Sequence, residues 1–186
     1  MAVYKMMDDF YGTLNDYWNL LNYICDDSRH TICYIGNTFI FSKVKEEMFE
    51  ELWDNKKKRN KLTGRFATHH IISLSEEEMR HITPHQLLEI GYKIAALTPE
   101  YGAVFAVHEE CDNLHLHMMI DCAPMYGNKK FHLSHQEFIQ RRNDIFEIIG
   151  SYILHNLKQY SEYIDGGTKC VYSSTDPCYF CRVIPG

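Results

Sequence analysis

The sequence predicts an α+β domain of two layers, in which helices pack on a central sheet that is rich in antiparallel strands. The expected order of elements is strand, helix, strands, helix, strand, helix, hairpin and helix, a mixture that favours this class. Two strand-like segments, 101–108 and 114–122, are separated only by a short polar turn, as in an antiparallel hairpin. Hydrophobic residues make up 45% of the chain and charged residues 24%, as in ordinary folded domains.

The expected strands lie where β-branched and aromatic residues gather. Segment 32–41 contains a Gly-Asn pair, so it forms either two short strands or one strand with a bulge. The other expected strands are 2–7, 67–74 and the two of the hairpin.

Helix starts are marked by capping residues. Thr13 with Asp16, and Ser134 with Glu137, place a hydroxyl and a carboxylate three residues apart, which is the pattern of an N-terminal cap. Thr83, followed by a proline, marks a further start. The helices are expected from Thr13 to about Cys25, from about Lys43 into a basic stretch, from Thr83 to about Leu97, and from Ser134 to about Gln159.

The length of 186 residues suits one domain with a short appendage. We expect that domain in residues 1–160 and a cysteine-containing tail in residues 161–186. No apolar run reaches the roughly 18 to 20 residues that cross a bilayer, and the N-terminus lacks the pattern of a signal peptide. The sequence therefore predicts a cytoplasmic protein with no membrane segment.

The cysteines form an odd set of seven that is mostly scattered, which favours reduced thiols over a disulfide framework. Cys178 and Cys181 form a CxxC pair, and Cys170 lies upstream of it. A structural zinc site needs two further ligands, and the sequence has no second CxxC. Zinc bound by this pair, Cys170 and a histidine stays an alternative to reduced thiols.

The net charge of −6 argues at first sight against nucleic-acid binding, because proteins that bind phosphates usually carry a basic surface. The charge is unevenly distributed, however. Six of the 19 basic residues, and no acidic residue, lie in one run: Lys56, Lys57, Lys58, Arg59, Lys61 and Arg65. Such a run is by itself typical of a solvated helix end, but beside a nuclease site it becomes the expected path of a DNA backbone.

Three histidines lie within ten residues, from His108 to His117. His115 and His117 project from one face of a strand with Cα atoms about 6 to 7 Å apart, so their imidazoles converge on one ion. His108 ends the preceding strand, and hairpin pairing returns it beside them. Three neutral imidazoles with open coordination positions are typical of a catalytic metal site. The alternative is a set of polar histidines on an exposed sheet face.

The string AVHEECDNLHLHMMID resembles the metal motif of plasmid mobilisation relaxases of the MOB-P type, within the HUH endonuclease superfamily. In that family a histidine pair and a histidine seven residues upstream bind a divalent ion, which implies His108, His115 and His117 as ligands of Mg²⁺ or Mn²⁺. The family's aspartate two residues after the first histidine is Glu110 here, and the asparagine that ends its strand is Asp121.

The same resemblance extends in order over about residues 2–155. The family's nucleophilic tyrosine, near the end of the first helix, falls on Tyr23. The chain contains 13 tyrosines, and a tyrosine near a helix end is ordinarily a packing residue, so Tyr17 and Tyr34 stay alternatives.

Further residues are expected to support the site. His70 begins an apolar strand that ends in a serine, which resembles another relaxase motif. Because His69 and His70 are neighbours on a strand, one should face the site and the other the core or solvent. Glu110 or Asp112 is expected to orient a ligand imidazole or to accept the tyrosine proton. We therefore place Glu110 among the catalytic residues, and His70, Asp112 and Asp121 around the ligands.

The resemblance implies a metal-dependent, site-specific endonuclease and strand transferase that nicks single-stranded DNA through a 5′-phosphotyrosine intermediate in plasmid or mobile-element mobilisation and conjugation. The expected partners are single-stranded DNA at an origin-of-transfer-like site and accessory relaxosome proteins. The alternatives are a rolling-circle replication initiator or transposase of the same superfamily, a non-catalytic DNA-binding accessory module with the relaxase fold, and a metal hydrolase for a small substrate.

Overall fold

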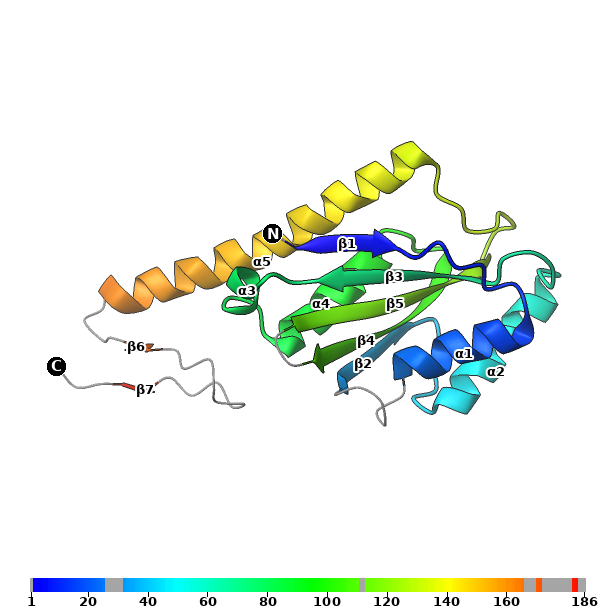
Figure 1. Ribbon diagram of the computed structural model, residues 1–186, viewed down its shortest axis with the longest axis horizontal. Helices are drawn as coiled ribbons and strands as arrows, with labels where there is room; N and C mark the ends of the chain where they lie inside the picture. Colours follow the sequence, from blue (N-terminus) through cyan, green and yellow to red (C-terminus); the bar gives the residue numbers. More distant parts are fainter. Residues whose placement is uncertain (1, 26–31, 111–112, 166–169, 172–181, 184–186) are drawn as a thin grey trace.

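A five-stranded antiparallel sheet organises the chain (Figure 1). The computed structural model describes residues 2–25, 32–110, 113–165, 170–171 and 182–183. The strand order is β1-β3-β5-β4-β2, and the strands are β1 (Val3–Met6), β2 (Ile32–Thr38), β3 (Ala67–Ser73), β4 (Tyr101–Glu110) and β5 (Asn113–Pro124). The helices are α1 (Leu14–Cys25), α2 (Lys45–Lys58), α3 (Glu76–Met79), α4 (Pro84–Ala95) and α5 (His135–Asp165), and the short strands β6 (Cys170–Val171) and β7 (Arg182–Val183) pair with each other.

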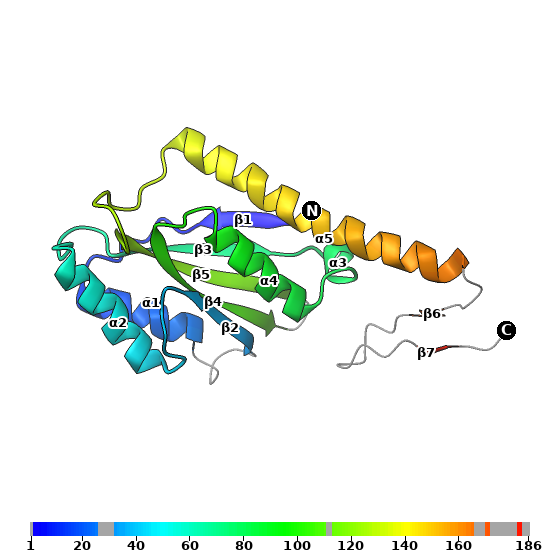
Figure 2. The same cartoon turned by 180° about the vertical axis from the view of Figure 1, so that it is seen from behind.

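Helices cover both faces of the sheet. α1 and α2 pack on one face, and α4 and α5 on the other (Figures 1 and 2). The α+β class and the antiparallel sheet are confirmed, but the domain has three layers and not the two that we predicted. The reason lies in the hairpin strands, which are apolar on both sides: Phe105 and Leu116 belong to the core under α4 and α5, whereas Val104 and Met119 belong to the core under α1 and α2.

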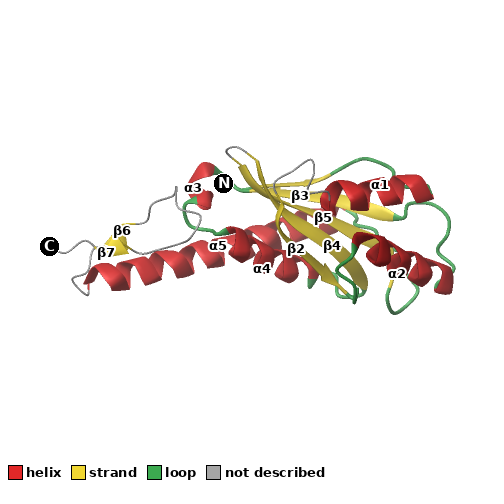
Figure 3. Ribbon diagram, turned by 90° about the horizontal axis from the view of Figure 1, so that it is seen from below, coloured by secondary structure: helices red, strands yellow, loops and turns green. Residues whose placement is uncertain are grey.

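The capping residues act as the sequence predicts. The amide of Thr13 donates to the Asp16 carboxylate at 3.0 Å, and the amide of Asp16 donates to the Thr13 hydroxyl at 3.1 Å. Segment 32–41 contains the single strand β2, so the alternative of one strand is confirmed. Its register shifts between Ile32 and Tyr34 and not at the Gly-Asn pair where we expected a bulge. Helix α5 continues past the predicted end, and Figure 3 shows it extending beyond the strands. The short helix α3 was not predicted.

A buried ion pair ties α1 and α2 to the sheet. The Lys56 ammonium of α2 contacts the Asp121 carboxylate of β5 and donates to the carbonyl of Phe66 at 2.8 Å. The Tyr17 hydroxyl of α1 donates to the same carboxylate at 2.6 Å. Lys56, Asp121 and Tyr17 are each 0% exposed. Charges this deeply buried are tolerated because each one is paired and hydrogen-bonded.

Among the described residues, no helix combines the length and the apolar character that a membrane span requires.

Replacing Lys56 with methionine should lower the free energy of unfolding by about 3 to 5 kcal/mol, because the change leaves the buried Asp121 carboxylate without its cation. Urea denaturation measures the effect. The exposed neighbour Lys57, which pairs with Asp54 at 2.9 Å, provides the matched control, and Lys57→Met should change stability little. Adding Asp121→Asn to Lys56→Met should restore part of the loss. Equal effects of the two lysine substitutions would show that the buried pair contributes no stability.

Candidate active site

The β4–β5 hairpin brings together the three histidines predicted as metal ligands. His108 pairs directly with His115, and His117 lies opposite Ala106, so all three project from the sheet face that α1 and α2 cover. One ring nitrogen of each lies within 4.8 Å of the others. His108 and His117 are buried, and His115 is half-buried.

Helix α1 fixes the orientation of His108. The Nε2 atom of His108 lies 2.9 Å from the carbonyl oxygen of Ile24, in the last turn of α1. Carbonyls in a last helical turn have no partner within the helix, so this one is available to an outside donor. Because a carbonyl only accepts, Nε2 carries the proton, and a neutral ring then has its lone pair on Nδ1, as a metal ligand requires.

His117 is held by a histidine of the neighbouring strand. The Nδ1 atom of His117 lies 2.8 Å from Nε2 of His69 in β3, and the two rings stack with centroids 5.1 Å apart. Burial lowers the pKa of His69 to about 4, so this ring is neutral at physiological pH. With Nδ1 engaged by His69, Nε2 is the atom of His117 that could bind a cation.

His69, and not the predicted His70, faces the cluster. His70 points to the opposite side of the sheet, where its Nδ1 lies 2.8 Å from the Tyr4 hydroxyl and its Nε2 lies 2.8 Å from the Thr68 hydroxyl. The alternation of side chains along a strand allows only one of the two histidines to face the site. The pairing of β3 with β5 decides which one it is.

Tyr23 lies beside the histidines, at the end of α1. Its ring meets His117 edge-on with centroids 5.3 Å apart, and it meets His69 at 6.0 Å. Tyr17, an alternative nucleophile, is fully buried against Asp121, and burial raises its pKa well above the usual value. Of the two, Tyr23 is the one placed at the cluster.

Tyr34, the other alternative, lies away from the cluster. It pairs with Val107, whose side chain belongs to the core under α4 and α5, and its ring contacts His85 of α4. Tyr34 therefore projects from the sheet face opposite the three histidines.

Tyr11 lies close to the site although the sequence analysis did not single it out. Its hydroxyl lies 3.4 Å from Nδ1 of His69 and donates to the Asp9 carboxylate at 3.3 Å. Burial and the neighbouring Asp9 raise the pKa of Tyr11 to about 12. The segment between β1 and α1 has no recognisable motif, so only tertiary structure reveals this contact.

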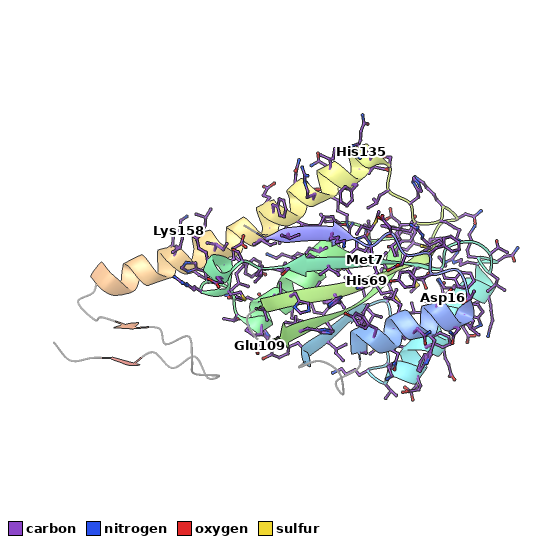
Figure 4. The ribbon with its side chains drawn as sticks, in the orientation of Figure 1. Met7, Asp16, His69, Glu109, His135 and Lys158 are labelled. Carbon is purple, nitrogen blue, oxygen red and sulfur yellow. The ribbon has the colours of Figure 1, made fainter. Side chains whose placement is uncertain are left out.

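Of the carboxylates predicted to support the site, one lies away from it and two have side chains outside the described part of the chain. The prediction that Asp121 lies around the ligands is wrong. Asp121 lies four residues beyond His117 on β5, about 13 Å along the strand, and its side chain bonds to Lys56 and Tyr17. Glu110 belongs to β4 at the end that bears the histidines, but its side chain is outside the described part of the chain. Asp112 also lies outside the described residues. Figure 4 shows the exposed neighbour Glu109 at the end of the hairpin.

The basic run is divided between core and surface. The prediction that Lys56 binds DNA is wrong, because its ammonium is buried against Asp121 and does not face solvent. Arg59 donates to backbone carbonyls of the segment after β5. The members with exposed or half-exposed side chains that remain at the surface are Lys57, Lys58, Lys61 and Arg65.

A five-stranded antiparallel sheet with three histidines on one hairpin and a tyrosine beside them is the arrangement expected of an HUH endonuclease fold. Residues 23–149 match the relaxase family described as the MobA/VirD2-like nuclease domain. The match covers more than half of the chain, so the chain belongs to this family.

Two solved structures are similar. One, from work on the molecular basis of vancomycin resistance transfer in Staphylococcus aureus, has a TM-score of 0.61 at 14% identity and covers 84% of this chain and 94% of its own. At this identity the likeness shows the fold alone. The copper-bound conjugative relaxase TrwC in complex with oriT DNA has a TM-score of 0.46 at 11% identity over 94% of this chain and 73% of that one, too low to support an argument. No curated protein matches the sequence.

The buried His70 should make stability fall in acid. Burial, with Arg141 and His69 nearby, lowers the pKa of His70 well below its usual value. The unfolded chain therefore binds a proton below about pH 6.5 that the folded protein rejects, and stability falls as the pH drops, by up to about 1.4 kcal/mol per pH unit. Urea denaturation between pH 7.5 and pH 5 with a chelator present measures the slope.

His70→Gln should flatten that slope, whereas His85→Gln, a change at an exposed position of α4, should leave it unchanged. The same slope in both variants would contradict the assignment.

Proposed function

We propose that this protein is a metal-dependent DNA nickase and strand transferase in which Tyr23 is the nucleophile. One observation supports this most directly: the Tyr23 ring packs against His117 at 5.3 Å, within a cluster of three histidines. Family membership supplies the second support, because the chain belongs to the MobA/VirD2-like relaxase nuclease family.

The donor set fits a divalent cation. His108, His115 and His117 would hold it, and we expect Mg²⁺ or Mn²⁺. Hydrogen bonds to Ile24 and His69 direct Nδ1 of His108 and Nε2 of His117 toward such an ion. When bound, the ion polarises a phosphodiester and stabilises the negative charge that develops on its oxygens.

Tyr23 supplies the covalent step. Its hydroxyl oxygen attacks the phosphorus and forms a 5′-phosphotyrosine, while the bond to the 3′ oxygen breaks and that oxygen takes up a proton. A phenol with a reference pKa near 10 needs a base to accept its proton. We assign that role to Glu110, which is two residues from His108 on β4. Because the product is still a phosphodiester, the reverse attack by a 3′-hydroxyl rejoins the strand.

The proposed substrate is single-stranded DNA at an origin-of-transfer-like site of a plasmid or mobile element, with accessory relaxosome proteins as further partners. The surface lysines of α2 and the loop after it offer cations to the phosphates. Phe10, which is 63% exposed and has the Arg65 guanidinium 5.7 Å above its ring, offers an aromatic face on which an unpaired base can stack.

Labelled single-stranded DNA that contains a transfer origin should form a covalent adduct with the protein in the presence of Mn²⁺. Tyr23→Phe should lower adduct formation by at least about three orders of magnitude, because the change removes the attacking oxygen. A chelator should abolish the adduct as well. Tyr34→Phe, which alters a tyrosine on the opposite sheet face, should leave the adduct intact. Denaturing gel electrophoresis measures it.

The same experiment separates the alternatives. DNA binding without an adduct under any metal would favour a non-catalytic accessory module. An adduct at a rolling-circle origin or a transposon end, but not at a transfer origin, would favour a replication initiator or a transposase. Persistence of the adduct in Tyr23→Phe would overturn the assignment of the nucleophile.

DNA affinity should fall steeply with salt, and the surface lysines should account for part of the slope. In Lys57→Gln/Lys58→Gln/Lys61→Gln, the slope of log K against log salt should flatten by about 0.7 for each lysine that contacts a phosphate. Lys56 is left out of this variant, because its ammonium is buried and its loss would destabilise the fold. Fluorescence anisotropy at several salt concentrations measures the slopes.

The exposed Lys93 of α4, on the opposite sheet face, supplies the control Lys93→Gln. An unchanged slope in the triple variant would remove this segment from the binding surface.

A further inference from the structure

We propose that Asp9, Tyr11 and His69 form a hydrogen-bonded relay that positions His117 and holds its proton on Nδ1. The proposal rests on the metal site proposed above and goes beyond it, because it assigns positioning roles to three residues outside the ligand set. Two of them lie between β1 and α1, a segment without any recognisable motif. The relay acts on the ligand and not on the reacting atoms.

The contact between His69 and His117 is the strongest link. Their nitrogens lie 2.8 Å apart, and both side chains are buried, with exposed fractions of 5% and 4%. Two neutral imidazoles at this distance form one hydrogen bond, in which a nitrogen of one ring donates and a nitrogen of the other accepts. Water has little access to this contact, so the protonated nitrogen of one ring fixes the protonated nitrogen of the other.

The direction of each hydrogen bond in the relay follows from His117 binding the cation through Nε2. An imidazole binds a cation through its lone pair, so a ligand whose Nε2 faces the cation must carry its proton on Nδ1. Nε2 of His69 then accepts, which places the His69 proton on Nδ1. That atom faces the hydroxyl oxygen of Tyr11 at 3.4 Å, and the Tyr11 proton points to the Asp9 carboxylate at 3.3 Å. All three protons point away from the cation toward a negative charge.

Backbone contacts keep this segment against β3. The amide of Met7 donates to the carbonyl of His69 at 2.8 Å, and Figure 4 shows Met7 beside His69. Tyr11 forms an isolated bridge with Ala67, and its carbonyl accepts from the amide of Phe66 at 2.7 Å. The Tyr11 side chain is therefore held next to His69 by main-chain bonds that a change of side chain does not remove.

The strength of the relay should decrease with distance from the cation. Partners behind a metal-bound histidine fix its orientation and raise its basicity, and their loss typically lowers metal affinity about 10- to 100-fold. The two outer contacts are longer than the inner one, and the Asp9 side chain is exposed, so solvent screens its charge. We expect the largest effect at His69, a smaller one at Tyr11 and the smallest at Asp9.

The test is Mn²⁺ affinity measured by titration calorimetry on the full chain without DNA, together with the Tm of the metal-free protein. His69→Leu should weaken Mn²⁺ binding about 10- to 100-fold. His69→Gln should retain most of the affinity, because its amide oxygen can accept the proton that Nε2 of His69 accepts. Tyr11→Phe should weaken binding by a few-fold and Asp9→Asn by less.

Tyr4→Phe is the matched control. The Tyr4 hydroxyl contacts the other β3 histidine, His70, at 2.8 Å on the opposite sheet face. Its removal should lower the Tm without changing the Mn²⁺ affinity, whereas Tyr11→Phe should lower the affinity with little change in Tm.

The outcomes are distinguishable from failure of the proposed function. Wild-type protein that binds no Mn²⁺ would overturn the metal site itself. If a folded His69→Leu variant binds Mn²⁺ as tightly as the wild type, the relay is overturned and the metal site still stands. If His69→Leu does not fold, the comparison of Tyr11→Phe with Tyr4→Phe decides, and equal affinities in these two variants would overturn the relay.

Discussion

The register of the β4–β5 hairpin is the constraint on which the site depends. Pairing of His108 with His115 places both rings, and that of His117, on one face of the sheet. A shift of one residue in β5 would turn its side chains to the opposite face, into the core under α4 and α5. The apolar alternation of both strands opposes such a shift, because Leu116 and Met118 would then leave that core. Core packing and site geometry are therefore set by the same pairing.

Helix α1 connects the proposed nucleophile to a proposed metal ligand. Tyr23 and Ile24 are consecutive residues, so the same helical turn places the tyrosine beside His117 and the carbonyl that contacts His108. The buried contacts among Lys56, Asp121 and Tyr17 fix this helix to the sheet at its other end. Asp121 therefore does support the site, although it does so by anchoring α1 and α2 and not by touching the histidines.

Lys56 shows how a sequence pattern can be read in two ways. As part of a basic run it resembles a surface residue, but Met48, Leu52 and Lys56 are spaced four residues apart and lie on one face of α2. The helical period thus placed Lys56 on the buried face, and this signal was available in the sequence. Its partner was not, because Asp121 is 65 residues away along the chain.

The sequence by itself determined the features that depend on neighbouring residues: the capped helix starts, the hairpin, and the projection of His115 and His117 from one side of a strand. Tertiary structure alone decided that His69 faces the three histidines and that Tyr11 reaches it. These features arise from packing between distant segments, whose relative positions no local period or motif specifies.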